Sequence, residues 1–147
     1  MISVLISVYI KEKAKNLKEA LESIIEQTFL PKETVLVKDG PLNEELDKVI
    51  DIYKERFAKK GVELKVVALE ENKGLSLALN EGLKFCSCEY VARMDSDDIA
   101  DAKRLALQYE FLENNKDIAA LGSDIIEFVE KGKALRTKTM PTEYEKL

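Results

Sequence analysis

Short apolar runs alternate with stretches of helical periodicity four times along this chain, and few folds accommodate that order. Residues 2–8 are apolar or β-branched apart from two serines. This composition is typical of a strand that is buried on both faces of a sheet. Further strand-like runs span residues 34–37, 62–69 and 89–94. The alternation predicts an α/β fold, an open, doubly wound and mostly parallel sheet with helices on both faces.

The helical stretches are marked by apolar residues three and four positions apart. The first is predicted to run to about Thr28 and to stop before Pro31, and Gly61 suits the end of the second. Residues 118–128 form a later strand-like run, and Gly132 marks a turn before a weak strand around Leu135. The four apolar stripes are Leu17, Ala20, Leu21, Ile24 and Ile25; Leu46, Val49, Ile50, Tyr53 and Phe57; Leu75, Ala78, Leu79, Gly82, Leu83 and Cys86; and Ala102, Leu105, Tyr109 and Leu112.

Length and charge limit the class of protein. A chain of 147 residues fits one domain with its own core, and a hydrophobic fraction of 46% with 35% charged residues is typical of globular proteins. The net charge of -5 is spread over both signs, which disfavours a nucleic-acid partner and favours a small-molecule ligand. The sequence has no long apolar span and no basic leader, so we expect a cytoplasmic location.

Cysteine and histidine usage narrows the chemistry further. Cys86 and Cys88 are too close together for a typical structural disulfide, and no further Cys or any His completes a zinc site. We expect both to be reduced packing residues. The absence of His also excludes mechanisms that depend on an imidazole, including Ser-His and Cys-His nucleophile pairs.

Unusual polar residues follow the predicted strands at their carboxyl ends. In doubly wound sheets ligands bind outside these ends, so the loops at Tyr9, Asp39, Asn72-Lys73 and Asp95–Asp98 are expected to converge on one crevice. The sequence has no glycine-rich phosphate loop, neither the dinucleotide-binding pattern nor a glycine-lysine-serine/threonine motif. A diphosphate in this crevice therefore needs another source of positive charge.

The acidic cluster, Asp95, Asp97 and Asp98, supplies a candidate for that source. Three carboxylates within four positions repel one another unless a cation or hydrogen bonds compensate them. Mg²⁺ and Mn²⁺ prefer such oxygen ligands and complete their shell with water and phosphate oxygens. A cation at this position would favour the departure of a diphosphate leaving group. By itself, an Asp-Ser-Asp-Asp stretch is also compatible with a solvated turn, and Asp39-Gly40 with an ordinary one.

Several segments together resemble the family 2 glycosyltransferases, which have the GT-A fold for nucleotide-diphospho-sugar transfer. The likeness covers nearly the whole chain, with the segments in the expected order. They are Ser3-Val4-Leu5-Ile6-Ser7-Val8-Tyr9, Leu21-Glu22-Ser23-Ile24-Ile25-Glu26-Gln27-Thr28, Val35-Leu36-Val37-Lys38-Asp39-Gly40, Glu71-Asn72-Lys73-Gly74, Ala78-Leu79-Asn80-Glu81-Gly82 and Met94-Asp95-Ser96-Asp97-Asp98.

The resemblance implies a role for residues in three of the loops. Ser7, Val8 and Tyr9 would border the uracil and the ribose, largely through backbone groups. Asp39 would accept a hydrogen bond from the base, and Lys73 would lie near the base or the phosphates. Many relatives have Asp in place of Lys38, so this lysine either changes the base contacts or pairs with an acid.

The resemblance also implies roles in the acidic cluster. Asp95, Ser96 and Asp97 form the family's Asp-x-Asp motif at the nucleotide-sugar site. Asp97 is predicted to bind Mn²⁺ or Mg²⁺ directly, with Asp95 near the ribose or the metal. Asp98 would orient the loop.

The resemblance implies metal-dependent, inverting transfer of a sugar from a nucleotide diphosphate sugar, UDP-linked, to a saccharide or lipid-linked acceptor. The Lys-Asp-Gly-Pro variant resembles the branch that assembles bacterial surface polysaccharide. The family's catalytic base lies in a later acidic motif, so we expect it beyond Leu147. Residues 1–147 are then a single donor-binding domain, the N-terminal part of a longer enzyme, whose remaining part would contact the inner face of the membrane.

Other functions are compatible with parts of the pattern. A non-catalytic nucleotide-sugar binding module would share the donor site without a base. A nucleotidyltransferase would normally have a glycine-rich, basic loop after the first strand, which this sequence lacks. A dehydrogenase is disfavoured by the missing glycine fingerprint, although Asp39 follows the second strand as a ribose-binding acid would.

Overall fold

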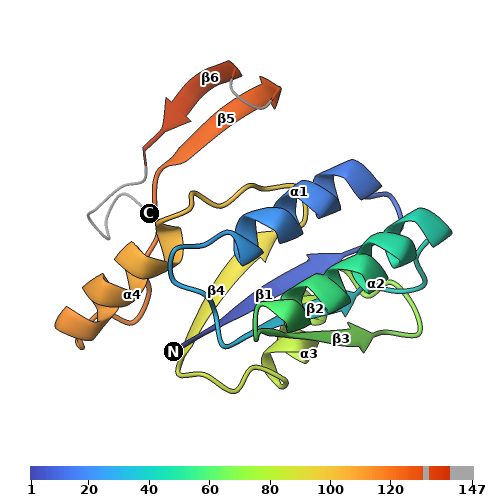
Figure 1. Ribbon diagram of the computed structural model, residues 1–147, viewed down its shortest axis with the longest axis horizontal. Helices are drawn as coiled ribbons and strands as arrows, with labels where there is room; N and C mark the ends of the chain where they lie inside the picture. The colour runs from blue at the N-terminus through green and yellow to red at the C-terminus, as the bar shows by residue number, and fades with distance from the viewer. Residues whose placement is uncertain (131–132, 140–147) are drawn as a thin grey trace. The chain divides into compact units, whose positions relative to one another are not determined.

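The computed structural model describes residues 1–130 and 133–139 and divides into two compact units (Figure 1). The first unit spans Met1–Phe111 and the second Leu112–Leu147. The first unit contains every residue predicted above for the nucleotide-sugar site. No helix in the described part of the chain is long and apolar enough to cross a membrane.

The first unit is built on a four-stranded parallel sheet. Its strands are β1 (Ile2–Val8), β2 (Glu33–Lys38), β3 (Glu63–Ala68) and β4 (Tyr90–Asp95), in the order β3-β2-β1-β4. All of β1 is buried, as its apolar composition predicts. The chain adds β2 and β3 on one side of β1 and then returns to add β4 on the other. The fold class predicted from the sequence is confirmed.

The helices lie where the apolar periodicity predicts them. They are α1 (Ala14–Ile25), α2 (Glu44–Lys59), α3 (Leu75–Leu83) and α4 (Arg104–Asn114). Helix α1 ends earlier than the predicted Thr28. Asn43 is the N-cap of helix α2, and its side chain accepts a hydrogen bond from the Leu46 amide at 2.9 Å. Gly61, with φ of 74°, follows the end of the helix.

Helices cover both faces of the sheet. On one face, apolar side chains of β1, including Ile6, pack with residues from α1 and α2 and with Leu105 of α4. On the other face, which α3 covers (Figure 1), Leu5, Val35 and Val37 pack against Ala78 of this helix. The alternation of side chains along each strand therefore sorts the core into two layers.

Helix α3 is packed mainly through small residues. Of the stripe predicted for this helix, Ala78 and Gly82 are buried, whereas Leu75 and Leu83 are exposed. A Cβ added at Gly82 would lie 2.5 Å from Leu5 Cδ1 and 2.6 Å from Val37 Cγ2. The backbone of α3 thus contacts the sheet closely; Leu79 packs there partly buried, and Leu75 and Leu83 lie outside that contact.

In the second unit, β5 (Ile125–Glu130) and β6 (Lys133–Lys138) form an antiparallel pair. The strand-like run predicted from residue 118 becomes a strand only at Ile125, and the predicted weak strand around Leu135 is β6. The turn predicted at Gly132 lies outside the described residues.

Candidate functional site: the carboxyl edge of the sheet

The strand order reverses between β1 and β4, and the predicted site residues gather at this point. In the sheet register, Ser7 of β1 is the partner of Val37 in β2 and of Asp95 in β4. A reversal of strand order in an open α/β sheet leaves a crevice outside the carboxyl ends of the strands, where ligands bind. Asp95 therefore lies beside the end of β1, where this strand order predicts a ligand crevice.

Hydrogen bonds link the loops along this edge into one unit. The Asp39 amide donates to the Val8 carbonyl at 2.8 Å, joining the ends of β2 and β1. The Ser96 hydroxyl donates to Glu12 Oε2 at 2.8 Å, joining the loop after β4 to the loop after β1. These loops are therefore linked as neighbours along the edge, and their convergence on one crevice stays a prediction.

Asp39 is only 4% exposed, and its carboxylate fixes the loop between β3 and α3. Its Oδ1 accepts from the Lys73 amide at 2.7 Å, and its Oδ2 accepts from the Gly74 amide at 3.1 Å. Each carboxylate oxygen has a second lone pair, so Asp39 can still accept a hydrogen bond from a ligand. The contact between Asp39 and a base stays a prediction.

Gly40 is required by the same junction. It has φ of 85°, and a Cβ at this position would lie 2.7 Å from the backbone nitrogen of Asn72. The Asn72 side chain in turn donates to the Asp39 carbonyl at 3.3 Å. An L side chain at position 40 would push the β3–α3 loop away from the end of β2.

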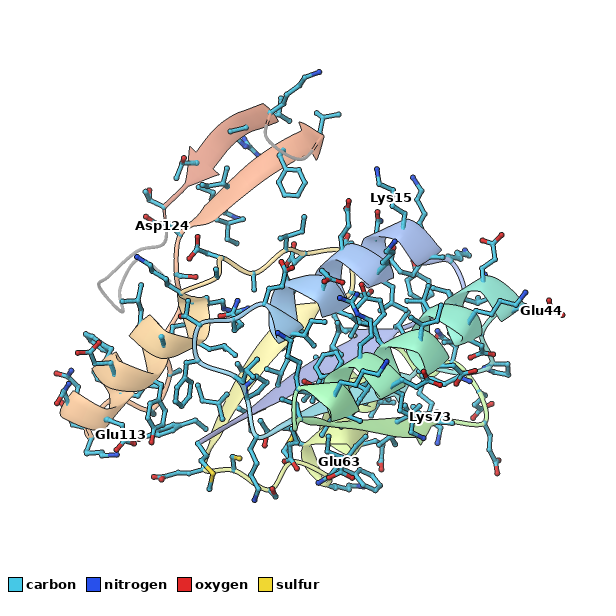
Figure 2. All side chains as sticks on the ribbon, in the orientation of Figure 1. Lys15, Glu44, Glu63, Lys73, Glu113 and Asp124 are labelled. Atoms are coloured by element: carbon cyan, nitrogen blue, oxygen red, sulfur yellow. The ribbon has the colours of Figure 1, made fainter. Side chains whose placement is uncertain are left out.

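The two lysines at this edge differ in their contacts. Lys38 forms an ion pair with Asp47 of α2 at 2.7 Å, so it pairs with an acid, one of the two roles considered for it. Lys73 lies in the β3–α3 loop and is labelled in Figure 2; its backbone amide contacts Asp39 while its side chain is exposed. The ammonium group of Lys73 is thus accessible to a ligand.

Ser7, Val8 and Tyr9 form the end of β1 and the start of the next loop. Ser7 is 9% exposed and Val8 1%, whereas Tyr9 is 44% exposed. Contacts from Ser7 and Val8 to a ligand would therefore come largely from the backbone, and the ring of Tyr9 is available at the rim.

The acidic cluster carries more negative charge than its neighbours compensate. Arg93 pairs with Asp95, but among the residues that the structure describes none donates a hydrogen bond to Asp97. Burial, followed by repulsion from Asp95 and Asp97, raises the pKa of Asp98, and Arg93 and Arg104 partly offset this effect. The cluster is thus electrostatically suited to receive a cation.

The carboxylates of the acidic cluster also suit the metals predicted from the sequence, Mn²⁺ and Mg²⁺. Within residues 1–130 and 133–139, no three Asp, Glu or Cys side chains converge to form a complete metal cage. Mg²⁺ and Mn²⁺ sites that use one or two carboxylates and fill their shell with water and phosphate oxygens need no such cage. Asp97, with Asp95 beside it, fits this type of site.

Glu12 was not predicted from the sequence, although it is central to the geometry. Its Oε1 accepts from the Lys13 amide at 2.7 Å and from Asn16 Nδ2 at 3.0 Å, while Oε2 accepts from Ser96. An acid just before a helix commonly interacts with the helix N-terminus, so nothing in the local sequence distinguishes this one. Ser96, predicted as part of the donor site, is 7% exposed, with its hydroxyl directed to Glu12.

The sequence model of glycosyl transferase family 2 matches residues 3–147, and this chain belongs to that family. The chain is 45% identical over 141 residues to the amylovoran biosynthesis glycosyltransferase AmsE of Erwinia amylovora, covering 96% of this chain and 51% of AmsE. It is 39% identical over 126 residues to the UDP-Gal:alpha-D-GlcNAc-diphosphoundecaprenol beta-1,3-galactosyltransferase of Escherichia coli, covering 86% and 45%. The chain thus spans about half the length of these curated relatives.

Solved structures agree with the fold. The S. aureus TarS 1-349 complex with UDP-GlcNAc superposes with a TM-score of 0.65 at 32% identity, covering 78% of this chain and 32% of that chain. The Pyrobaculum calidifontis mannosyltransferase PcManGT gives a TM-score of 0.66 at 24% identity, covering 76% and 32%, which shows a shared fold alone. The family and the fold predicted from the sequence are both confirmed.

Proposed function

We propose that this chain binds the donor of a glycosyl transfer, a nucleotide diphosphate sugar, in the crevice at the carboxyl ends of β1, β2 and β4. The single observation that carries the proposal is the position of Asp95, beside Ser7 at the reversal of strand order, with Asp97 two residues further on. Membership of glycosyl transferase family 2 supports the same assignment.

The nucleotide is assigned to the side of the crevice formed by β1 and β2. Backbone groups from Ser7 to Tyr9 would border the base and ribose, and Asp39 would accept a hydrogen bond from the uracil ring. Lys73 would lie near the base or the phosphates, where its accessible ammonium group can interact with negative charge. A UDP-linked donor is supported by the UDP-GlcNAc complex of TarS and by the name of the E. coli relative.

The diphosphate is assigned to the acidic cluster. Asp97 would hold a Mn²⁺ or Mg²⁺ ion, with Asp95 as a second ligand or as a partner of the ribose. When bound, that ion would supply the positive charge that stabilises the diphosphate as a leaving group. Arg93 pairs with Asp95, so a cation bound to this carboxylate would share or replace that contact.

The proposed acceptor is a saccharide or a lipid-linked saccharide, as the names of the polysaccharide-assembling relatives suggest. A lipid-linked acceptor would bring the protein to the cytoplasmic surface of a membrane. Two carboxylates at this edge already serve other contacts, Asp39 with backbone amides and Glu12 with Ser96. From the family resemblance, in which the base lies in a later acidic motif, we assign the base that activates the acceptor hydroxyl in an inverting transfer to a residue outside these 147.

Calorimetric titration of UDP with and without Mn²⁺ tests the proposal. The wild-type protein should bind UDP more tightly with Mn²⁺, and Asp97→Asn should reduce the affinity to about that of UDP without metal. Asp51→Asn makes the same chemical change on the exposed surface of α2 and should leave both affinities unchanged. Equal UDP binding in the two conditions by the wild-type protein would contradict a metal-bridged diphosphate.

A non-catalytic nucleotide-sugar binding module is the second candidate. It is favoured because Asp39 and Glu12 already accept hydrogen bonds from other groups of the protein. A transfer assay with the intact gene product distinguishes the two. Release of UDP that depends on a saccharide acceptor would establish a transferase, whereas tight donor binding without such release would establish a binding module.

A further inference from the structure

Helix α1 holds the loop that carries the acidic cluster, residues 96–103 between β4 and α4, at both of its ends. At the N-terminal end of α1, Glu12 accepts the hydrogen bond from Ser96. Glu12 is itself fixed by Asn16 in the first turn of α1. The first residue after Asp95 is therefore tied to one end of this helix.

At the C-terminal end of α1, Ser23 holds the other end of the β4–α4 loop. Ser23 is 8% exposed, and its hydroxyl accepts from the Ala100 amide at 3.0 Å while donating to the Ala20 carbonyl at 2.7 Å. A buried amide without a partner costs about 1–3 kcal/mol, so the Ser23 hydroxyl determines where Ala100 can lie.

Gln27 extends the same contact toward α4. Its amide group donates to the Asp101 carbonyl at 2.6 Å and to the Ser23 carbonyl at 3.0 Å, and its oxygen accepts from the Leu105 amide at 3.0 Å. Gln27 is 5% exposed, so water does not readily replace these bonds. The Thr28 amide adds a bond to the Ala102 carbonyl at 2.8 Å.

These contacts account for the two buried polar residues, Ser23 and Gln27, in the Ser-Ile-Ile-Glu-Gln-Thr stretch of the sequence, in which the apolar positions form the core. Ser23 and Gln27 lie beyond hydrogen-bond contact with Asp95 and Asp97, yet they fix the backbone that follows the acidic cluster. Because α1 is anchored to the sheet through buried residues such as Leu21 and Ile24, its two ends form a rigid frame for the loop.

We propose that Ser23 and Gln27 are positioning residues that set the geometry of Asp97 for metal-dependent binding of the nucleotide diphosphate. The inference rests on the function proposed above. Residues that hydrogen-bond to the ligands of a metal commonly contribute about 10–100-fold to metal affinity, and Ser23 and Gln27, which bond to the backbone after the ligand, are assigned the lower end of this range. Fixing the loop before the ligand arrives also avoids the entropic cost of ordering it on binding.

Ser3 offers a matched control for Ser23. It is a buried serine at the opposite edge of the sheet, and its hydroxyl likewise donates one hydrogen bond, to Glu33 Oε1 at 2.6 Å, and accepts one, from the Cys88 amide at 3.2 Å. Ser23→Ala and Ser3→Ala therefore remove the same number of hydrogen bonds from buried positions. Only the first removes a contact to the β4–α4 loop.

The experiment compares UDP affinity with and without Mn²⁺ for the wild type, Ser23→Ala and Ser3→Ala at a temperature where all three are folded. Ser23→Ala should lower the Mn²⁺-dependent gain in UDP affinity about 10-fold, whereas Ser3→Ala should leave it unchanged. In an Asp97→Asn background, Ser23→Ala should have no further effect on that gain, because both changes act on the same interaction. If the Mn²⁺-dependent gain in UDP affinity were equal in Ser23→Ala and Ser3→Ala, the inference would be overturned while the proposed function would still stand.

Hydrogen exchange provides a second measurement that needs no nucleotide. Gln27→Leu and Ser23→Ala should accelerate amide exchange in peptides covering residues 96–105, and Ser3→Ala should not. Unchanged exchange in that segment for both α1 variants would overturn the inference even where the proposed function holds. A wild-type protein that binds UDP equally with and without Mn²⁺ would overturn the proposed function and the inference together.

Discussion

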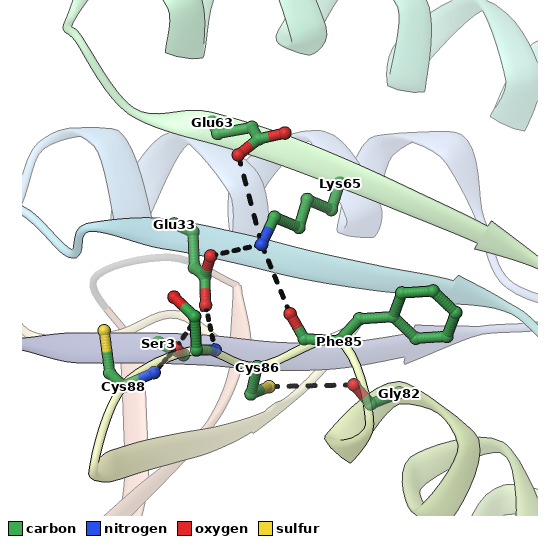
Figure 3. A network of polar contacts seen from close by, with 9 residues as sticks. Ser3, Glu33, Glu63, Lys65, Gly82, Phe85, Cys86 and Cys88 are labelled. Atoms are coloured by element: carbon green, nitrogen blue, oxygen red, sulfur yellow. Dashed lines mark hydrogen bonds and ion pairs between the residues drawn. The ribbon is translucent and has the colours of Figure 1, made fainter.

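A buried carboxylate at the amino edge of the parallel sheet and the exposed acidic cluster at its carboxyl edge are neutralised to different extents. At the amino edge, Glu33 accepts hydrogen bonds from the Ser3 hydroxyl at 2.6 Å, the Ser87 amide at 2.5 Å and Lys65 at 2.5 Å (Figure 3). Burial alone would raise the pKa of Glu33, but the bonds from Lys65, Ser3 and Ser87 outweigh it and lower the pKa to about 2. The protein satisfies this carboxylate completely with its own groups.

At the carboxyl edge, the acidic cluster is left with excess negative charge. Arg93 pairs with Asp95, yet repulsion from Asp95 and Asp97 contributes to the raised pKa of Asp98. A carboxylate that the chain neutralises stabilises the fold, whereas carboxylates that it leaves uncompensated favour a ligand with positive charge. The difference separates the edge that stabilises the fold from the edge that is proposed to bind the donor.

The largest expected effect is on stability at the amino edge. Glu33→Ala removes the acceptor of the Ser3 hydroxyl and of the Ser87 amide from a buried position, and it should lower the free energy of unfolding by about 3–5 kcal/mol, measured by urea denaturation. The exposed Glu63, whose carboxylate lies 4.0 Å from Lys65, is the control, and Glu63→Ala should change stability by less than about 0.5 kcal/mol. Equal losses in the two variants would break the distinction between the edges.

The pH dependence of stability should follow from the same carboxylate. The pKa of Glu33 is lowered from 4.5 to about 2 in the fold, so its contribution is present above pH 4.5 and is lost as the pH falls toward 2. The loss should amount to about 3 kcal/mol over that window, since one pKa unit corresponds to about 1.4 kcal/mol. Denaturation of wild type and Glu33→Gln at several pH values checks this, and parallel curves from pH 5 to pH 2 would contradict it.

A smaller effect is expected at the junction of β2 with the β3–α3 loop. Gly40→Ala should cost about 2–3 kcal/mol, because φ is 85° and the new Cβ would meet the Asn72 nitrogen. Gly61 also has positive φ, 74°, but no atom lies within 4 Å of its added Cβ, so Gly61→Ala should cost only about 1 kcal/mol. UDP affinity should fall in Gly40→Ala alone; a fall of the same size in Gly61→Ala would attribute it to general destabilisation.

The smallest effect is expected within the acidic cluster. Asp98→Asn removes a charge that repels Asp95 and Asp97 but that is not assigned as a metal ligand. UDP affinity in Mn²⁺ should change by only about twofold, as for a partly exposed charge pair, whereas Asp97→Asn should lose the metal-dependent gain. Calorimetry on both variants compares them, and a greater loss in Asp98→Asn would move the metal site to Asp98.

Much of this arrangement could be predicted from residue patterns. The run of apolar residues before Asp95 places the acidic cluster at the end of a strand, and the alternation of strands and helices places that end beside Tyr9. The end of α1 could not be predicted, because Gln27 and Thr28 are both compatible with a helix. In the structure, the Gln27 side chain bonds to the Asp101 carbonyl and the Thr28 amide to the Ala102 carbonyl, beyond the end of the helix. Apolar periodicity carries no information about such distant polar partners.

The sequence by itself determined the order of the elements, the identity of the carboxylates at the carboxyl edge and the absence of a glycine-rich phosphate loop. Only the tertiary structure decided that Asp39 binds the amides of Lys73 and Gly74, that Glu12 holds Ser96, and that Gln27 bonds the amide of Leu105, 78 positions away. The physical reason is that local periodicity selects helices and strands, whereas a buried hydrogen bond depends on which backbone groups the folded sheet brings within 3 Å or so of a side chain.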